Sequence, residues 1–111
     1  MECNRGDIVG INLNPKKGDE IGKVRPCIIV SDDDENSILD TIIVIPLSTQ
    51  LIDDMLPYRV RLPKRGNLER DSDVLINHIR TISKKRVTSK IAKITQEEYR
   101  LVIDSLCKNF A

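Results

Sequence analysis

Arg25 and Ser48 are the two side chains whose types and positions best suit chemistry on a phosphate group. Arg25 stands where a loop with two glycines ends and an apolar run begins, and Ser48 ends the next apolar run. Neighbouring strands could bring the two together. A guanidinium offers a rigid fork of donors that matches a phosphate, and a hydroxyl can add another hydrogen bond. Together they could stabilise a phosphorane-like transition state without a metal ion.

The same two residues also have a purely structural interpretation. Arg25 could be a surface arginine that precedes Pro26, and Ser48 could cap the end of a strand. Both arrangements are common in folded proteins. The residues by themselves leave the catalytic and the structural interpretations open.

Other motifs for metal, nucleotide or acyl chemistry are missing from the sequence. It has a single histidine, and Cys3, Cys27 and Cys107 form no CxxC pair. No glycine-rich phosphate loop occurs. We therefore expect no cofactor and no metal site. Three cysteines that cannot all pair, with no secretory signal ahead of them, favour a reducing cytoplasm.

The charge of the chain is balanced in total but unevenly distributed. Its 18 basic and 17 acidic residues give a net charge of +1. Residues 1–58 hold 5 basic and 11 acidic side chains, whereas residues 59–111 hold 13 and 6. This asymmetry is compatible with a surface that binds a polyanion, although composition alone favours an ordinary, highly charged solvated surface. The absence of Trp, with two Tyr and one Phe, argues against a base-stacking platform.

Apolar runs and alternation predict short β-strands along most of the chain. We expect strands near residues 8–13, 27–31, 40–46, 58–62, 74–82 and 87–94, the fifth being a strand pair or a bent strand. Pro26 should occupy the first position of its strand, where its missing N–H costs no ladder bond. In residues 58–62 the alternation predicts a basic outer face. Residues 14–23 should form an exposed loop, residues 32–37 an acidic turn, and residues 83–86 a basic connector.

The last element is predicted to be an amphipathic helix. Thr95 followed by Glu98 matches a capping box. An apolar stripe with spacings of three and four should cover one face of a sheet; it consists of Tyr99, Val102, Ile103, Leu106, Cys107 and Phe110. The chain thus predicts one mainly β domain, residues 1–111, folded as a small antiparallel barrel with a helix closing one side. The longest apolar run, Ile42 to Ile45, is far shorter than the roughly 20 residues of a membrane span.

Several motifs, in their order and spacing, resemble those of the MazF/PemK family of toxin–antitoxin ribonucleases. They are RGDIV at 5–9, NLNP at 12–15, GDE at 18–20, VRPCIIVS at 24–31, IVIPLS at 43–48 and LINHIRTISKKR at 75–86. The resemblance covers about residues 5–94, with the terminal helix also expected. Each motif is weak alone, but the ordered set is specific.

The resemblance implies a small SH3-like antiparallel β-barrel of the MazF/PemK/CcdB type, usually dimeric. It implies sequence-specific, metal-independent cleavage of single-stranded RNA. In that family the ribose 2′-OH attacks the adjacent phosphate and leaves a 2′,3′-cyclic phosphate and a 5′-OH end. The catalytic arginine and its Thr or Ser partner fall at the positions of Arg25 and Ser48. A cognate antitoxin, with an acidic and extended C-terminal segment, neutralises the toxin.

Two departures from the family pattern affect the predicted chemistry. Many relatives carry Glu-Gln or Asp-Gln where this chain has Asn77 and His78, so the identity of the general base stays open. His78 is the obvious chemical candidate, although alternation groups it with apolar neighbours, which favours a structural role. Ser48 stands where Thr is frequent; the hydroxyl is kept and the methyl is lost. Thr49 could take the place of Ser48 if the register of the strand shifted by one residue, although that would send the Thr49 side chain to the opposite face.

The substrate surface is expected to combine the loop of residues 14–23 with the segment after Ser48. The candidate RNA-binding residues are Lys16, Lys17, Glu20, Lys23, Thr49, Gln50, Asn77, His78 and Arg80. The lysines could follow phosphates, and Glu20 could accept from a base amino group. A non-catalytic toxin of the same fold, acting on a protein such as gyrase as the CcdB group does, is the alternative function.

Overall fold

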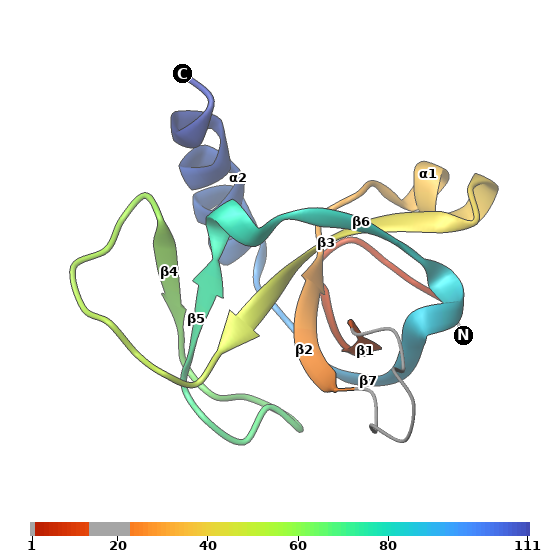
Figure 1. Ribbon diagram of the computed structural model, residues 1–111, viewed down its shortest axis with the longest axis horizontal. Helices are drawn as coiled ribbons and strands as arrows, with labels where there is room; N and C mark the ends of the chain where they lie inside the picture. Colours follow the sequence, from red (N-terminus) through yellow and green to blue (C-terminus); the bar gives the residue numbers. More distant parts are fainter. Residues whose placement is uncertain (1, 14–22) are drawn as a thin grey trace.

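The computed structural model of the chain describes residues 2–13 and 23–111 and consists mainly of antiparallel strands with a C-terminal helix (Figure 1). In chain order the elements are β1 (Asp7–Asn12), β2 (Val24–Ile29), α1 (Asp33–Ile38), β3 (Thr41–Ser48), β4 (Arg59–Leu62), β5 (Ser72–Leu75), the 3-10 helix η1 (Ile76–His78), β6 (Arg80–Ser83), the 3-10 helix η2 (Lys84–Arg86), β7 (Val87–Lys93) and α2 (Gln96–Asn109). The mainly β fold with a terminal helix is thereby confirmed. Among the described helices, none has the length and apolar character needed to cross a membrane.

Strand β3 organises the sheet because its two halves pair with different strands. Its first half pairs with β6, where Val44 lies opposite Arg80, and its end pairs with β5, where Ser48 lies opposite Asp73. Its other edge pairs with β2. The strand order is β4-β5-β3-β2-β1-β7, with β6 as a branch from β3. Within the described part of the chain, these pairings leave β4 and β7 at the two ends of the sheet.

Two apolar clusters lie on opposite faces of the strands, as the alternation of side chains requires. Ile8 and Ile28 belong to the first cluster, whereas their neighbours Val9 and Cys27 belong to the second. Helix α2 covers the first cluster through the fully buried Val102. The second cluster is built from aliphatic residues and cysteines of the strands and adjoining segments; it consists of Cys3, Val9, Ile11, Leu13, Cys27, Ile29, Ile42, Val44 and Ile82.

Helix α2 has the predicted cap but a shorter buried stripe than expected. Thr95 accepts a hydrogen bond from the Glu98 N–H, and the Glu98 side chain accepts one from the Thr95 N–H, which confirms the capping box. The first four residues of the stripe pack on the sheet. Cys107 and Phe110 are exposed, so the prediction that they cover the sheet is wrong. Figure 1 shows why: the last turn of α2 extends beyond the strands.

Residues 33–38 form a helix, α1, where the sequence predicted an acidic turn. Asp32 caps it by accepting from the Glu35 N–H at 2.8 Å. Acidic side chains in the first turn interact favourably with the helix dipole. The helix is also anchored by Asn36, which is buried and hydrogen-bonded to Ser31. Capping and this buried contact outweigh the turn-forming tendency of the acidic residues.

Two further expectations are corrected around the strands. Pro26 is the third residue of β2 and lies opposite Gly10, so it does not open the strand. The ladder between β2 and β3 begins only at Cys27, so the missing N–H of Pro26 removes no hydrogen bond from that ladder. The segment 74–82, expected to be a strand pair or a bent strand, contains parts of two strands, β5 and β6, that η1 separates; each pairs with β3 and not with the other.

Candidate functional site

A cavity of about 630 Å³ lies where β2, β3, η1 and β6 meet. Apolar side chains form part of its wall, and polar and cationic side chains from three separate segments form the rest. The described residues that line it are Leu13, Lys23, Arg25, Pro46, Leu75, Asn77, His78 and Arg80. Five of the residues predicted to bind or cleave a substrate therefore meet in one place: Lys23, Arg25, Asn77, His78 and Arg80.

Arg25 reaches this cavity because of its register on β2. It lies opposite Ile11 of β1 and two residues before Cys27, so the pleat directs it to the face of the second apolar cluster. The Cys27 thiol donates to the Arg25 carbonyl at 3.7 Å. Burial raises the pKa of this thiol to about 12, against the opposing influence of Arg80 and Arg25. The thiol is therefore neutral, and both guanidinium groups lie near it.

The cavity carries a concentrated positive charge. Lys23, Arg25 and Arg80 are cationic, and no carboxylate is found among the described residues that line the cavity. Arg80 belongs to β6, which pairs with one edge of β3 along its first half. Arg25 belongs to β2, which pairs with the other edge of β3. Two planar guanidinium groups from opposite sides suit an oxyanion with several oxygens, such as a phosphodiester.

Asn77 and His78 enter the cavity from η1. The sequence pattern grouped His78 with the buried Val74 and Ile76, as on a continuous strand. That grouping is wrong, because the 3-10 turn interrupts the alternation and leaves His78 exposed beside Arg25. An exposed imidazole in this cavity can form hydrogen bonds with a bound molecule.

Ser48 lies at the end of β3, two residues beyond Pro46 on the same side of the pleat. Cys27 lies opposite Pro46, so the same register extended by two residues would set Arg25 opposite Ser48. The Ser48 Oγ accepts a hydrogen bond from the Gln50 N–H at 3.1 Å, which leaves its own O–H able to donate. Ser48 is not part of the described cavity lining, so it stands at the margin of the site.

The structure directs Thr49 and Gln50 away from the Arg25 cavity. Thr49 lines a smaller cavity of about 230 Å³ together with Pro26 and Leu68, on the opposite face of the strands. Gln50 is exposed, and its carbonyl accepts from Arg59 Nη1 at 2.9 Å. Alternation along β3 puts Ser48, and not Thr49, on the side of Pro46, which lines the Arg25 cavity. Lys16, Lys17 and Glu20 lie outside the residues that the structure describes.

Sequence reasoning missed two features of the site. The apolar wall of Leu13, Pro46 and Leu75 was not singled out, although the alternation of β1 and β3 contains the signal. Arg59 and Arg61 were predicted to form a basic outer face, but both are bound by Asp73, a partner that the local pattern does not indicate. In residues 2–13 and 23–111, no group of three His, Cys, Asp or Glu side chains could hold a metal ion.

These features define a small antiparallel β protein with a cationic cavity suited to a phosphodiester. The family model described as "PemK-like, MazF-like toxin of type II toxin-antitoxin system" matches residues 4–110. The chain is 37% identical over 107 residues to the endoribonuclease EndoA of Bacillus subtilis, covering 96% of this chain and 92% of that protein. The chain belongs to the family of PemK-like, MazF-like toxins of type II toxin–antitoxin systems.

Solved structures of similar fold support this assignment at the level of architecture. The MazE–MazF complex from Deinococcus radiodurans (Form-II) matches with a TM-score of 0.82 and 21% identity, covering 99% of this chain and 96% of that one. The Mycobacterium tuberculosis toxin MazF-mt6 matches with a TM-score of 0.78 and 18% identity, covering 94% of this chain and 95% of that one. The predicted family and its fold are thereby confirmed.

Proposed function

We propose that the chain is an endoribonuclease toxin that cleaves single-stranded RNA in the cavity containing Arg25. The observation that carries this proposal is the convergence of Arg25, Arg80 and His78 on one cationic cavity. Membership of the toxin family and 37% identity to the endoribonuclease EndoA support it. The resemblance to that family further suggests that cleavage is sequence-specific and needs no metal.

In the proposed reaction the ribose 2′-oxygen attacks the adjacent phosphorus. A bond forms between that oxygen and phosphorus, and the bond from phosphorus to the 5′-oxygen of the next nucleotide breaks. The proton of the 2′-OH passes to a base, and the departing 5′-oxygen gains a proton. The products are a 2′,3′-cyclic phosphate and a 5′-OH end. DNA would be resistant because it lacks the nucleophile.

Arg25 is assigned to the negative charge that develops on the phosphorane. A guanidinium already carries its proton before the reaction begins, so it is unsuited to accept the 2′-OH proton. It can donate hydrogen bonds to two oxygens at once and can supply a proton to the departing 5′-oxygen. Arg80 and Lys23 line the same cavity and would hold the flanking phosphates.

His78 is assigned as the group that accepts the 2′-OH proton. Among the described residues that line the cavity, it is the one with an imidazole, the side chain that most often serves as a general base in enzymes. Asn77 precedes it and could read a base edge through its amide. Ser48 would donate its O–H to a phosphate oxygen, since its Oγ already accepts from Gln50.

The proposed partners follow from the family and from the charge of the chain. The Deinococcus radiodurans structure pairs MazF with MazE. We propose that this chain forms a homodimer in the cytoplasm and is neutralised by a cognate antitoxin with an acidic, extended C-terminal segment. The cation-lined cavity would attract such a segment as it attracts RNA, so both interactions should weaken with salt.

Cleavage of a long single-stranded RNA in the presence of EDTA tests the proposed function. The expected result is discrete fragments with 5′-OH and 2′,3′-cyclic phosphate ends, and no cleavage of a DNA strand of the same sequence. Mapping the 5′-OH ends would also give the recognition motif. No cleavage by the wild-type chain would contradict the proposal and would favour a toxin that acts by binding a protein such as gyrase.

A further inference from the structure

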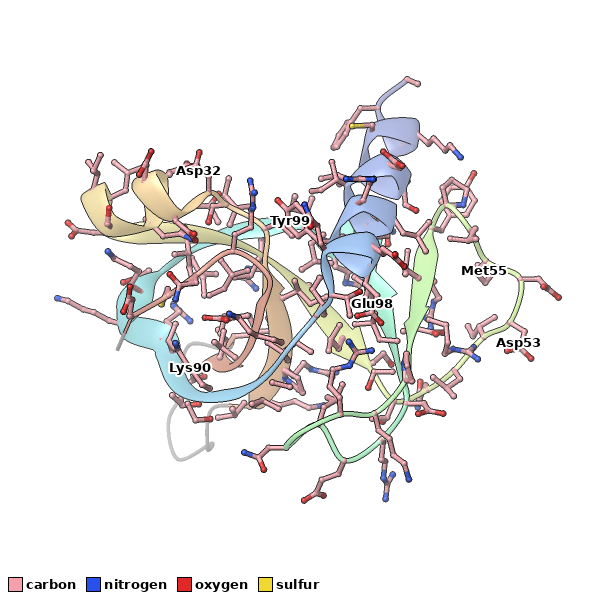
Figure 2. All side chains as sticks on the ribbon, turned by 180° about the vertical axis from the view of Figure 1, so that it is seen from behind. Asp32, Asp53, Met55, Lys90, Glu98 and Tyr99 are labelled. Atoms are coloured by element: carbon pink, nitrogen blue, oxygen red, sulfur yellow. The ribbon has the colours of Figure 1, made fainter. Side chains whose placement is uncertain are left out.

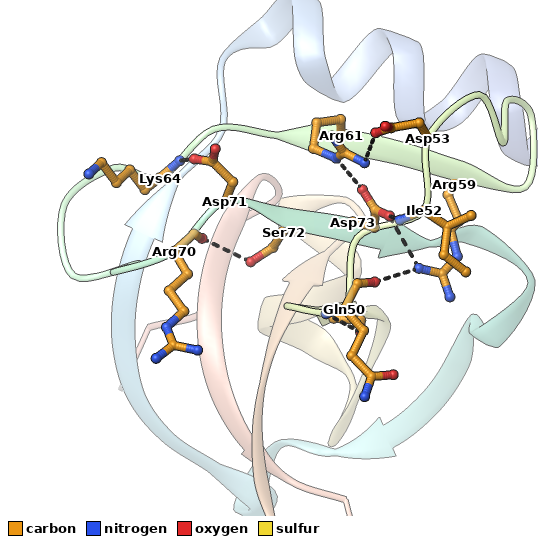
Figure 3. A network of polar contacts seen from close by, with 11 residues as sticks. Gln50, Ile52, Asp53, Arg59, Arg61, Lys64, Arg70, Asp71, Ser72 and Asp73 are labelled. Atoms are coloured by element: carbon orange, nitrogen blue, oxygen red, sulfur yellow. Dashed lines mark hydrogen bonds and ion pairs between the residues drawn. The ribbon is translucent and has the colours of Figure 1, made fainter.

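A buried carboxylate, Asp73 of β5, lies beneath the segment that follows Ser48 (Figure 3). Its side chain is about 1% exposed, and both of its oxygens are occupied. Oδ1 accepts from Arg61 Nε at 2.6 Å. Oδ2 accepts from Arg59 Nη1 at 3.2 Å and from the Ile52 N–H at 2.9 Å. A buried carboxylate with this many charge-assisted bonds holds its partners in fixed positions.

The same two arginines also bind the segment between β3 and β4. Arg59 Nη1 donates to the Gln50 carbonyl at 2.9 Å, and Arg61 Nη2 donates to Asp53 Oδ1 at 2.9 Å. The N–H of Gln50 donates in turn to Ser48 Oγ at 3.1 Å. A continuous chain of hydrogen bonds therefore runs from Asp73 through Arg59 and Gln50 to the hydroxyl of Ser48.

Packing contributes little to the position of this segment. Residues 49–54 are all exposed, including Leu51 and Ile52 at 43% and 48%. In Figure 2 the labelled Asp53 and Met55 lie on a loop that extends outward from the sheet. With few buried apolar contacts, the conformation of this loop depends on its polar anchors. Those anchors begin at Asp73, which also lies opposite Ser48 in the ladder between β3 and β5.

We propose that Asp73 and Arg59 are positioning residues for Ser48. This inference rests on the proposed function, in which Ser48 donates to the phosphate. Asp73 orients the Arg59 guanidinium, Arg59 fixes the Gln50 carbonyl, and the Gln50 N–H then holds the Ser48 oxygen in the acceptor role. The hydroxyl proton is thereby directed away from the backbone and toward the bound RNA. Neither Asp73 nor Arg59 needs to contact the RNA for this effect.

Arg61 provides a matched control within the same network. It belongs to the same strand as Arg59, has the same side chain and pairs with the same carboxylate, at the shorter distance of 2.6 Å. Its second contact is Asp53, five residues beyond Ser48, whereas the second contact of Arg59 is Gln50. If the network acted only on stability, loss of Arg61 should be as harmful as loss of Arg59.

The test compares Arg59→Gln with Arg61→Gln by kcat and KM on one RNA substrate, below the unfolding temperature of both variants. Small errors in the placement of a catalytic group can cost up to about a hundredfold in rate. We expect Arg59→Gln to lower kcat about tenfold or more with KM within about twofold, and Arg61→Gln to change kcat by less than about twofold. In a Ser48→Ala background, Arg59→Gln should cause no further loss, because both changes remove the same interaction.

Hydrogen exchange supplies a readout that does not depend on catalysis. The Gln50 N–H should exchange faster in Arg59→Gln and at the wild-type rate in Arg61→Gln. Equal losses of kcat in both variants, a change in KM alone, or additive effects with Ser48→Ala would overturn the positioning role. An inactive wild-type chain would instead contradict the proposed function, and the exchange rates would then still decide whether Arg59 anchors the loop.

Discussion

Arg25 of β2 and Arg80 of β6 line one cavity from opposite sides of β3. They are 55 residues apart in the chain, and both lie close enough to the buried Cys27 thiol to oppose the rise in its pKa. Like charges that face one cavity repel each other, and bound phosphate groups would relieve that repulsion. We propose that Arg25 contacts the scissile phosphate of the RNA and that Arg80 contacts a flanking one.

Removal of the Ser48 hydroxyl should impair chemistry rather than binding. Ser48→Ala is expected to lower kcat by about a hundredfold, the typical effect of losing one donor to a developing oxyanion. Ser48→Thr should keep full activity, because the hydroxyl remains and the added methyl restricts its rotation. Steady-state cleavage rates of the two Ser48 variants test both expectations. Ser89→Ala, an exposed serine of β7, is the control and should behave as wild type.

Arg80 should contribute to binding through a phosphate contact. Arg80→Ala is expected to weaken RNA binding and to reduce the slope of log K against log salt by about 0.7, the value for one contact to a single strand. Binding titrations at several salt concentrations measure the slope. Arg100→Ala removes the same charge from the exposed surface of α2. An equal change of slope in Arg100→Ala would show that net charge, not the cavity, is responsible.

The role of His78 can be read from the pH dependence of cleavage. A reaction that needs a general base slows at low pH, where the base is already protonated, so kcat should show an acidic limb. His78→Gln should cost about a hundredfold in kcat and should remove this acidic limb. If His78→Gln keeps the acidic limb of the pH profile, the general base must be another group.

Asp73 should contribute to the acid sensitivity of the fold. Burial alone would raise the pKa of its carboxyl, but the hydrogen bonds from Arg61, the Ile52 N–H and Arg59 lower it further than burial raises it. The folded pKa is therefore below the unfolded value of about 3.9. The stability that this provides is complete above about pH 4 and is lost as the pH falls through the folded pKa.

Asp73→Asn should cost about 3 kcal/mol in the free energy of unfolding at pH 7, as expected when one partner of a buried ion pair is removed. It should also reduce the dependence of stability on pH below about pH 4, where the carboxylate of the wild-type chain becomes protonated. Urea denaturation at several pH values measures both effects. Asp104→Asn, an exposed position on α2, should leave both quantities as in the wild-type chain.

Local patterns in the sequence were sufficient for most of the fold. Continuous apolar runs identify β1, β2 and β3, and the Thr95 and Glu98 pair identifies the start of α2. Arg25 is singled out by its position between a loop and an apolar run and by the family resemblance, and the structure places it in the cavity. These features depend on residues close together in the chain, where propensity and periodicity are informative.

The remaining features depend on contacts between distant segments. In the sequence, Asp73 is the last residue of a polar run, and only the pairing of β4 with β5 shows that it binds Arg59 and Arg61. His78 enters the cavity because a 3-10 turn interrupts the alternation, and no local signal marks that turn. Such effects arise from tertiary context, which overrides local propensity.

The most direct test of the central claim is the cleavage of a long single-stranded RNA by wild-type, Arg25→Ala and Arg100→Ala proteins in EDTA. Arg25→Ala should retain its fold and lose at least about a hundredfold in rate, because it removes the donors to the phosphorane. Arg100→Ala, with the same change of charge, should cleave at the wild-type rate. Equal cleavage by Arg25→Ala and wild type would contradict the assignment of the Arg25 cavity as the active site.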